Sequence, residues 1–513
     1  MPIIVELRPN RRLLDYDFEG YKLNLQSLPH YTYDLLSPVD KVYPDEIQYS
    51  FIHAKLFALH NHLVLDFWNY SFNYYYIDNQ QQVCYVSFEN TNSAFESTVV
   101  YDVPAHEERR SGHFNLCLSF PSPVLALVSD GTGYLHIINT GSRTGPKSKL
   151  QTWQTLESIL ILGEGKYFII VDSRLQVKDN VENVHCLLQS VEQNESHFNS
   201  VLTWITFYND GQGWKQQSLR EVQGKGIVHY AAIETSGTAL YLASDHLFKF
   251  TSDSEKEITG DVPEPPRTII YTWLQSTEDI TITLQLESNF NRKLVHVSVT
   301  PLLIKISYAG KAFINGKMKH KVTIDQSVPG FSTQDLEECD AASEEDTVLV
   351  RLDSISHKIT HRAPLSVHQF LFSIRTDTHE VPSLALRHDV DACIWQPYAQ
   401  LINSETWPIK HQGSLSAFSY VQSSKQNRKF VTCPPNFSYS VVCEASKHIF
   451  IYQTTGNNDC QLRKRTGGSM KNIKVGQQHL FNIDKFGEVL GINATNEYLF
   501  ILTETKLISI GIQ

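Results

Sequence analysis

The 513-residue sequence predicts an all-β fold: a β-propeller-like scaffold of about seven blades, formed by the N-terminal and C-terminal parts of the chain together. Three observations lead to this prediction. Apolar residues recur at every second position, in runs of five to eight residues rich in Val, Ile, Tyr, Phe and Thr. This is the period of a β-strand rather than of a helix. Gly, Asp, Asn and Ser bound these runs, and the same arrangement returns late in the chain.

The clearest strands of the first half form hairpins. Residues 124–128 and 134–138 are apolar runs separated by the turn sequence SDGTG at 129–133. Its glycines suit a turn because glycine adopts positive φ without steric cost. A second unit has the apolar runs 230–233, 239–243 and 247–250. The predicted repeating unit is therefore strand, tight turn, strand, tight turn, strand.

The second half of the chain repeats this unit. Apolar runs lie at 383–386, 392–395, 489–493, 498–502 and 507–510. One such meander cannot bury both of its faces, whereas blades stacked radially around an axis can. The sequence thus favours a propeller, with an array of two-sheet sandwiches as the structural alternative. A propeller closed by both ends of the chain requires residues 499–510 to pair near the N-terminal half.

Two compositional breaks divide the chain. Residues 261–267 (DVPEPPR) are a Pro-dense linker, since proline has a fixed φ and cannot continue a sheet ladder. Residues 334–346 (QDLEECDAASEED) carry seven carboxylates and no Lys or Arg, as in a solvated connector. We expect propeller parts at 1–260 and 345–513 and an inserted β module at 268–327. The strands expected in this module are 268–274, 280–286, 294–300, 302–308 and 319–324.

Composition excludes several classes of function. The formal net charge is -11 and the pI is near 6.0, so the chain lacks the cationic surface that nucleic acid or anionic lipid attracts. The first residues lack the apolar region of a secretory signal, and no apolar stretch reaches the ~20 residues of a membrane span. Eight cysteines without a C-x-x-C pair favour buried, reduced thiols. We expect a soluble intracellular protein without nucleic-acid partners or membrane insertion.

Candidate catalytic or metal-binding groups are few. The sequence contains no hydrolase, metalloprotease or phosphate-loop motif. The HDVD sequence at 388–391 could surround a divalent ion, but it lies between two apolar runs, where a turn is expected. His60 and His62, with His53, could suggest a metal cluster, but as alternate residues of a strand they would share a face without a third ligand, so histidines at the surface or a blade edge are favoured. The sequence predicts no catalytic residue, no cofactor and no metal.

Short strings over nearly the whole chain match a known family. They are LLD at 13–15, FEGYK at 18–22, SDGTG at 129–133, HYAAIE at 229–234, YTW at 271–273, LEECD at 336–340, LRHDVD at 386–391 and ATNE at 494–497. On these strings the chain resembles the NudC family, and its middle module resembles a CS domain. The resemblance implies a non-enzymatic, co-chaperone-like binding protein of the cytoplasm and nucleus. The implied partners are the heat-shock chaperone system, propeller-type clients and components of the dynein pathway.

The middle module departs from the CS pattern at its end. CS domains usually carry a second Trp late in the module, whereas this sequence has no Trp between Trp273 and Trp395. We therefore expect an incomplete CS domain that lacks its closing strands. Trp273, Lys305, Lys311 and Phe313 are the predicted partner-binding residues, because lysines near an aromatic ring suit an acidic surface; lysines that protect a sheet edge are the alternative.

Two other classes of function remain open. One is a structural, coat-like subunit that binds other propellers. The other is an enzyme with a pocket at the propeller axis, which would require the ionisable residues at 388–391 to converge with another ionisable group in a cleft.

Overall fold

The computed structural model describes residues 2–69, 73–144, 152–194, 197–258, 271–275, 280–284, 294–308, 311–317, 347–365, 368–399, 402, 406–425, 427–454, 459–460 and 473–512. The chain divides into two compact units. One contains residues 1–258 and 342–513, and the other contains residues 259–341.

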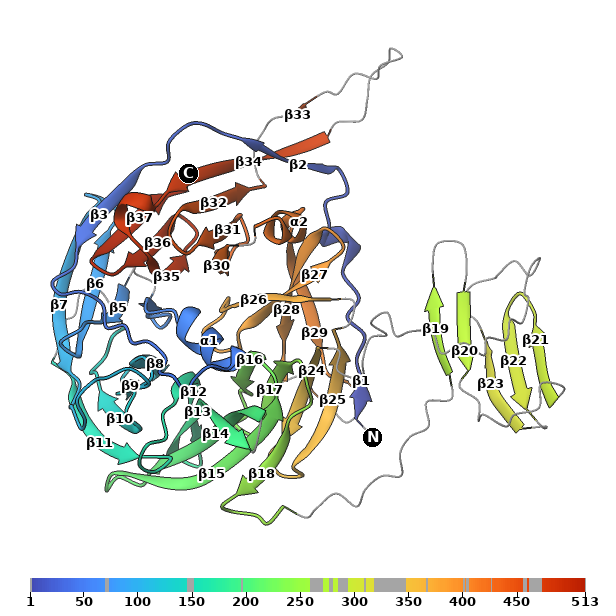
Figure 1. The fold of residues 1–513 in the computed structure, drawn as a ribbon, viewed down its shortest axis with the longest axis horizontal. Helices are drawn as coiled ribbons and strands as arrows, with labels where there is room; N and C mark the ends of the chain where they lie inside the picture. The colour runs from blue at the N-terminus through green and yellow to red at the C-terminus, as the bar shows by residue number, and fades with distance from the viewer. Residues whose placement is uncertain are drawn as a thin grey trace. The chain divides into compact units, whose positions relative to one another are not determined.

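Seven sheets surround a central axis in the first unit, which confirms the predicted propeller (Figure 1). We number these blades in chain order. Blade 1 contains β4 (Val64–Leu65), β5 (Asn73–Ile77), β6 (Gln82–Glu89) and β7 (Ala94–Asp102); blade 2 contains β8 (Cys117–Ser122), β9 (Leu125–Ser129), β10 (Tyr134–Asn139) and β11 (Gln154–Leu160); blade 3 contains β12 (Ile169–Lys178), β13 (Val181–Asn194), β14 (His197–Asn209), β15 (Trp214–Lys225) and β18 (Lys249–Asp253).

The other four blades lie wholly or partly in the second half of the chain. Blade 4 contains β1 (Ile3–Ile4), β16 (Val228–Ile233), β17 (Ala239–Ser244), β24 (Val348–Asp353) and β25 (Lys358–Pro364); blade 5 contains β26 (Phe370–Ile374), β27 (Ser383–His388), β28 (Asp391–Pro397) and β29 (Ile409–Leu415); blade 6 contains β2 (Phe18–Leu23), β30 (Arg428–Thr432), β31 (Tyr439–Glu444), β32 (His448–Gln453), β33 (Asp459–Cys460) and β34 (Ile473–Asn482); blade 7 contains β3 (His30–Asp34), β35 (Val489–Ala494), β36 (Tyr498–Thr503) and β37 (Lys506–Gly511).

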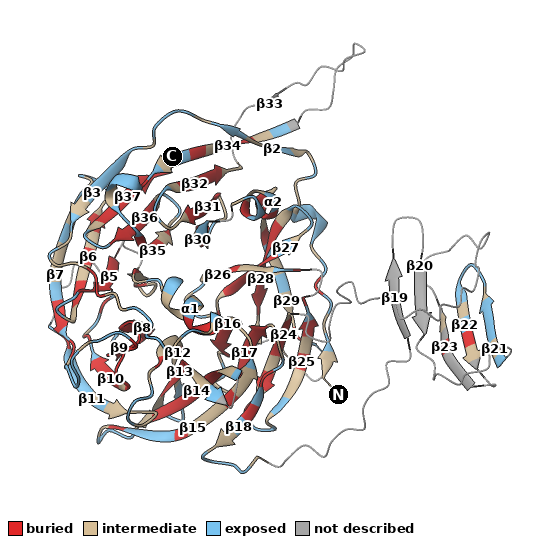
Figure 2. Ribbon diagram, in the orientation of Figure 1, coloured by how far each residue is buried: buried red, intermediate tan, exposed pale blue. Residues whose placement is uncertain are grey.

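Blades bury both of their faces, and this explains the apolar runs of the inner strands. All five residues of β5 are buried (Figure 2). Tyr74 and Tyr76 pack with Phe500 of blade 7, whereas Tyr75 packs with Phe120 of blade 2. Alternate residues of one strand therefore belong to two different cores, one on each side of the blade.

Blade 4 corrects one predicted meander. The runs 230–233 and 239–243 form β16 and β17, but the third strand of the expected unit, 247–250, does not pair with β17. It gives rise to β18, which pairs with β15 at the outer edge of blade 3. The strand beside β17 is β24, which follows the inserted unit in the chain. The insertion thus interrupts blade 4 between its second and third strands.

The N-terminal segment runs along the outside of the ring before it forms any blade of its own. β1 pairs with β25 of blade 4, β2 with β34 of blade 6, and β3 with β37 of blade 7. The prediction that residues 499–510 pair with the N-terminal half is confirmed, since Leu507 lies opposite Tyr33. Both chain ends therefore close the ring.

Blade 7 meets the segment before blade 1 at a glycine. The side-chain amide of Asn61 donates to the carbonyl of Ile492 (2.9 Å) and accepts from its N–H (3.1 Å). A Cβ on Gly491, which lies in β35, would come within 2.6 Å of the backbone nitrogen of Leu63 and 2.7 Å of Oδ1 of Asn61. The ring closes here because glycine allows the two segments to approach.

We expect Gly491→Ala to lower the free energy of unfolding by about 1–3 kcal/mol, because the added methyl overlaps backbone that cannot move aside. Urea unfolding followed by tryptophan fluorescence measures the change. Gly316→Ala is the matched control, since nothing lies within 4 Å of a Cβ added there. An unchanged unfolding midpoint for Gly491→Ala would show that this contact does not determine closure.

Two helices were not predicted. α1 (Phe51–Ala58) begins after Ser50, whose Oγ accepts from the N–H of His53 (3.2 Å) and so caps the helix. α1 lies at the centre of the ring, and α2 (Phe418–Ser423) lies between blades 5 and 6 in the chain (Figure 1). The prediction that His60 and His62 lie on a strand was wrong, because both lie in the segment after α1. His53 lies in α1 itself.

The described residues of the second unit form two small sheets. One pairs β19 (Tyr271–Gln275) with β20 (Ile280–Leu284), and the other joins β21 (Val295–Val299), β22 (Leu303–Tyr308) and β23 (Lys311–Lys317). Four of the five predicted strands coincide with β19 to β22. The fifth predicted strand, 319–324, the linker 261–267 and the connector 334–346 lie outside the described residues.

Candidate functional sites

The second unit places the predicted partner-binding residues on three strands. Trp273 lies in β19 opposite Ile282, and Lys311 lies at the start of β23 opposite Tyr308. Lys305, in β22, is exposed. Phe313 lies in β23; its side chain and those of Trp273 and Lys311 lie outside the described residues.

One face of β21 and β22 is apolar and partly open. Val297 lies directly opposite Ile306, so the two side chains share a face. Ile306 is buried, but Val297 is 44% exposed. Leu303, three positions before Ile306, lies on the opposite face of β22 and is 52% exposed. Val297 therefore leaves apolar surface exposed on one face of this sheet, and Leu303 on the other.

The propeller carries a second exposed apolar surface, on the segment that leads into α1. Tyr43, Ile47, Tyr49 and Phe51 are each 60–75% exposed. We call these four residues the aromatic patch. Clustered exposed apolar side chains mark interaction surfaces in soluble proteins. The patch was not predicted, because its spacing follows neither a strand nor a helix, although four bulky apolar residues within nine positions were a visible signal.

The loop between blades 1 and 2, residues 103–116, holds the patch segment in place. Arg109 donates to Oδ2 of Asp40 (2.9 Å), the N–H of Gly112 donates to the carbonyl of Tyr43 (2.9 Å), and the side-chain amide of Gln48 donates to the carbonyl of Gly112 (2.7 Å). Burial raises the pKa of Asp40, and Arg109 offsets only part of this. These hydrogen bonds therefore hold the backbone of the patch segment against the 103–116 loop.

A cavity of about 450 Å³ lies at the axis of the ring beneath α1. Its walls combine α1 and the segment after it with the innermost strands of blades 1 to 5. The lining includes Lys55, His60, His62, His229 and Cys117. Burial raises the pKa of the Cys117 thiol to about 12, so the thiol is protonated at neutral pH and is a poor nucleophile.

A chain of polar contacts attaches α1 to blade 4 across this cavity. Nζ of Lys55 lies 3.4 Å from Nδ1 of His229, and Nε2 of His229 lies 2.5 Å from Oδ1 of Asp245. Burial lowers the pKa of Lys55. Burial would raise the pKa of Asp245, but the hydrogen bonds from His229 and from the Ile227 N–H outweigh it and lower that pKa. The contacts fix the position of α1.

His60 and His62 form a pair in the cavity, with ring centres 4.5 Å apart. Burial lowers the pKa of His60 to about 4, and nearby Lys429 lowers it further while a backbone contact with Leu116 opposes this. The pKa of His62 is lowered by burial and by His60. Both rings are therefore neutral at pH 7.

The 388–391 sequence does not form a reactive cleft. His388 and Asp391 face each other across the β27–β28 hairpin, and Asp389 has a positive φ of 53° in its turn. Asp391 accepts from the N–H of Ala417 (2.6 Å). None of the three residues lines the axial cavity. The structure places them at a turn, where the enzyme alternative required a converging site.

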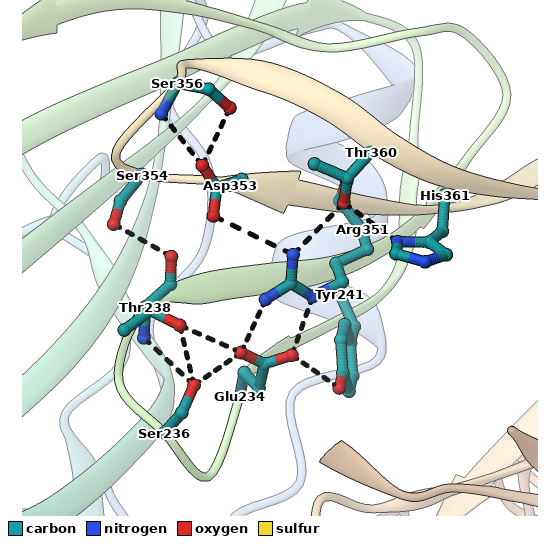
Figure 3. Close-up of polar contacts among 10 residues, drawn as sticks. All are labelled: Glu234, Ser236, Thr238, Tyr241, Arg351, Asp353, Ser354, Ser356, Thr360 and His361. Carbon is teal, nitrogen blue, oxygen red and sulfur yellow. Dashed lines mark hydrogen bonds and ion pairs between the residues drawn. The ribbon is translucent and has the colours of Figure 1, made fainter. Parts of the chain in front are cut away.

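A buried ion pair joins the two parts of blade 4 across the insertion (Figure 3). Nε and Nη2 of Arg351 donate to the two carboxylate oxygens of Glu234, at 2.7 and 2.9 Å. Tyr241 donates to the same carboxylate (2.8 Å), and Nη1 of Arg351 donates to Thr360 (3.1 Å). Burial would raise the pKa of Glu234, but Arg351 and Ser236 outweigh it and lower that pKa. We call Glu234 and Arg351 the blade 4 clamp.

Known proteins resemble the chain over its whole length. A family model described as the CS domain matches residues 269–337, which is ten residues beyond the end predicted for the module. NudC domain-containing protein 1 of Mus musculus is 29% identical over 582 aligned positions, which cover 99% of this chain and 98% of the relative. The protein of the same name from Xenopus tropicalis is 29% identical over 584 positions, covering 98% and 97%.

The resemblance predicted from the sequence is therefore confirmed. Because 582 aligned positions exceed the 513 residues of this chain, the mouse relative contains residues that the chain lacks.

Among solved structures, the WD40 domain of SCAP from fission yeast aligns with a TM-score of 0.35 at 7% identity, covering 96% of this chain and 97% of that one. No helix in the described part of the chain combines the length and the apolar character that crossing a bilayer requires.

Proposed function

We propose that this chain, a relative of NudC domain-containing protein 1 along its whole length, is a non-enzymatic scaffold that binds proteins through its propeller and its CS domain. The observation that carries the proposal is the CS domain match within a unit inserted into blade 4. The proposed partners are the heat-shock chaperone system, propeller-type clients and components of the dynein pathway. The proposed location is the cytoplasm and the nucleus.

Two surfaces support separate binding tasks. In the CS domain, Trp273, Lys305, Lys311 and Phe313 form the proposed contact with chaperone, and the exposed Lys305 suits an acidic partner. On the propeller, the aromatic patch is the proposed contact with client proteins. Exposed tyrosines and phenylalanines supply large contact areas at low entropic cost.

An incomplete CS domain is part of the proposal. The mouse relative contains residues that this chain lacks, and Val297 and Leu303 leave apolar surface open on the described strands. The exposed Val297 fits a sandwich without its closing strands, and the proposal assigns to those strands residues that the chain lacks. We infer that a partner chain covers this surface when the scaffold is engaged.

The axial cavity supports a structural role rather than catalysis. Lys55, His229 and Asp245 bond to one another, and the Cys117 thiol is protonated. Their arrangement holds α1 across the ring. The patch segment leads directly into α1, so this attachment supports the proposed client surface.

A pull-down from cytosol tests the function. Tagged full-length chain is compared with a chain lacking 268–327, with Lys305→Glu/Lys311→Glu, and with Tyr49→Ser/Phe51→Ser. We expect the first two variants to lose chaperone about tenfold or more while clients remain. We expect the patch variant to lose clients only, because a central interface side chain contributes about 2 kcal/mol or more.

Lys178→Glu, an exposed lysine on blade 3, is the matched control and should retain every partner. If the deletion leaves the captured proteins unchanged, the chaperone link is wrong. In that case the coat-like alternative, in which the propeller alone binds other propellers, explains the chain better.

A further inference from the structure

Two histidines and an aspartate from two segments of the chain meet at blade 2. His106 comes from the loop between blades 1 and 2, Asp130 from the turn between β9 and β10, and His136 from β10. One possible ligand atom from each lies within 4.8 Å of the other two. Residues 129–133 were predicted to form a turn, and the positive φ of Gly131 and Gly133 agrees with that. The convergence of the two histidines on this turn was not predicted.

The spacing of the first two residues suits a shared metal ion. Nδ1 of His106 lies 3.4 Å from Oδ2 of Asp130. This is long for a hydrogen bond between charged groups. Two ligands of one tetrahedral zinc ion, each about 2.0–2.1 Å from the metal, lie about 3.3 Å apart. The pair therefore has the separation of two co-ligands.

His136 supplies the second, independent observation. Its side chain is fully buried, and Nδ1 lies 2.8 Å from Oγ of Ser158. Nε2 is buried and has no hydrogen-bond partner within the described structure. A buried polar atom without a partner requires an explanation, and a bound ion is one that also accounts for the nearby His106 and Asp130. When Nδ1–H donates to Ser158, the lone pair of Nε2 is free to coordinate.

The surroundings orient the other two ligands. Oδ1 of Asp130 accepts from the N–H groups of Thr132 (2.8 Å) and Tyr134 (3.1 Å), and Oδ2 accepts from the Thr132 hydroxyl (2.6 Å). The His106 ring stacks on the ring of Tyr134, with centres 3.6 Å apart. Its side chain is 27% exposed, which leaves a path from solvent for an ion. Contacts of this kind hold metal ligands in place before the ion binds.

We propose that His106, Asp130 and His136 bind a divalent transition-metal ion of the zinc class. Two imidazoles and one carboxylate are a ligand set that suits zinc, and the fourth position is left to water. The bound ion ties the 103–116 loop to blade 2. Because Arg109 and Gly112 of this loop hold the patch segment, the ion also stabilises the base of the aromatic patch.

Zinc titration of the full-length chain tests the proposal. The protein is stripped with EDTA, desalted, and titrated with Zn²⁺ in a calorimeter; Co²⁺ absorption reports the coordination geometry. We expect one tight equivalent. We expect His106→Gln to weaken that site at least 100-fold, and Ser158→Ala to weaken it about 10–100-fold with the cobalt spectrum retained, as for a positioning residue.

Hydrogen exchange gives a readout that does not depend on affinity. Zinc should slow exchange in residues 103–116 of the wild type and not in His106→Gln. His106 is partly exposed, so its variant should fold, and thermal unfolding without metal checks this. His197→Gln, at an exposed histidine, is the control and should bind zinc as the wild type does. Equal zinc affinity in the wild type and His106→Gln would overturn the proposal and leave an ordinary His–Asp contact.

Discussion

Arg351→Met is expected to lower the free energy of unfolding of the propeller by about 3–5 kcal/mol. Glu234 is 2% exposed and receives both carboxylate hydrogen bonds of the blade 4 clamp from Arg351. Without Arg351, a charged carboxylate stays buried with only hydroxyl donors. The clamp links β24 to the turn after β16, and the ladder between β17 and β24 remains when the clamp is lost.

Urea unfolding of the full-length chain measures this effect. Lys166→Met is the matched control, because Lys166 and Glu192 form an exposed pair (2.8 Å) whose loss should change stability by about 0–1 kcal/mol. The double variant Glu234→Leu/Arg351→Met should recover part of the loss, since no buried charge then remains unpaired. A loss below about 1 kcal/mol for Arg351→Met would show that the clamp does not hold blade 4 together.

Acid is expected to destabilise the propeller steeply between about pH 6.5 and pH 4. The pKa values of His60 and His185 are lowered to about 4 by burial, and that of His62 is also lowered. An unfolded histidine titrates near 6.5, so in this window the unfolded chain binds protons that the folded chain does not. The contribution of these buried, neutral histidines to the free energy of unfolding is therefore fully present above pH 6.5 and is lost as the pH falls toward 4.

Each of these histidines contributes up to about 1.4 kcal/mol per pH unit within the window. Unfolding midpoints at pH 7, 6 and 5 give the slope. His60→Gln/His62→Gln should reduce the slope, whereas His197→Gln, at an exposed position, should leave it unchanged. If the double variant keeps the slope of the wild type, the cavity histidines are not the groups that take up protons.

The strands of the propeller could be predicted because each blade strand alternates or is continuously apolar over a short run. The hairpins at 124–138 and 489–510 lie where the pattern placed them, as β9, β10 and β35 to β37. The pairing of β18 with β15 could not be predicted, because periodicity records that a strand has a buried face but not which neighbour it pairs with.

The candidate sites were predicted unevenly for a similar reason. Lys305 could be proposed from the local sequence and is exposed in the structure, while its binding role stays a prediction. The Glu234–Arg351 clamp joins residues 117 positions apart, and the metal cluster joins His106 to the hairpin that holds Asp130 and His136. Neither set of contacts could be predicted from the spacing of residues in the sequence. α1 was missed because its eight residues are nearly uniformly apolar and show little amphipathic pattern.

The sequence alone determined that this chain is a β protein, that its two ends belong to one ring, and that a CS-type module interrupts it. Turn residues, the alternation of apolar and polar residues, and the short strings shared with a family are local features, so they can be read directly from the sequence. Only the tertiary structure decided which strands share a blade, what closes blade 4 over the insertion, and which histidines meet an aspartate. These depend on contacts between segments distant in the chain, and such contacts form only when the seven blades pack around their axis.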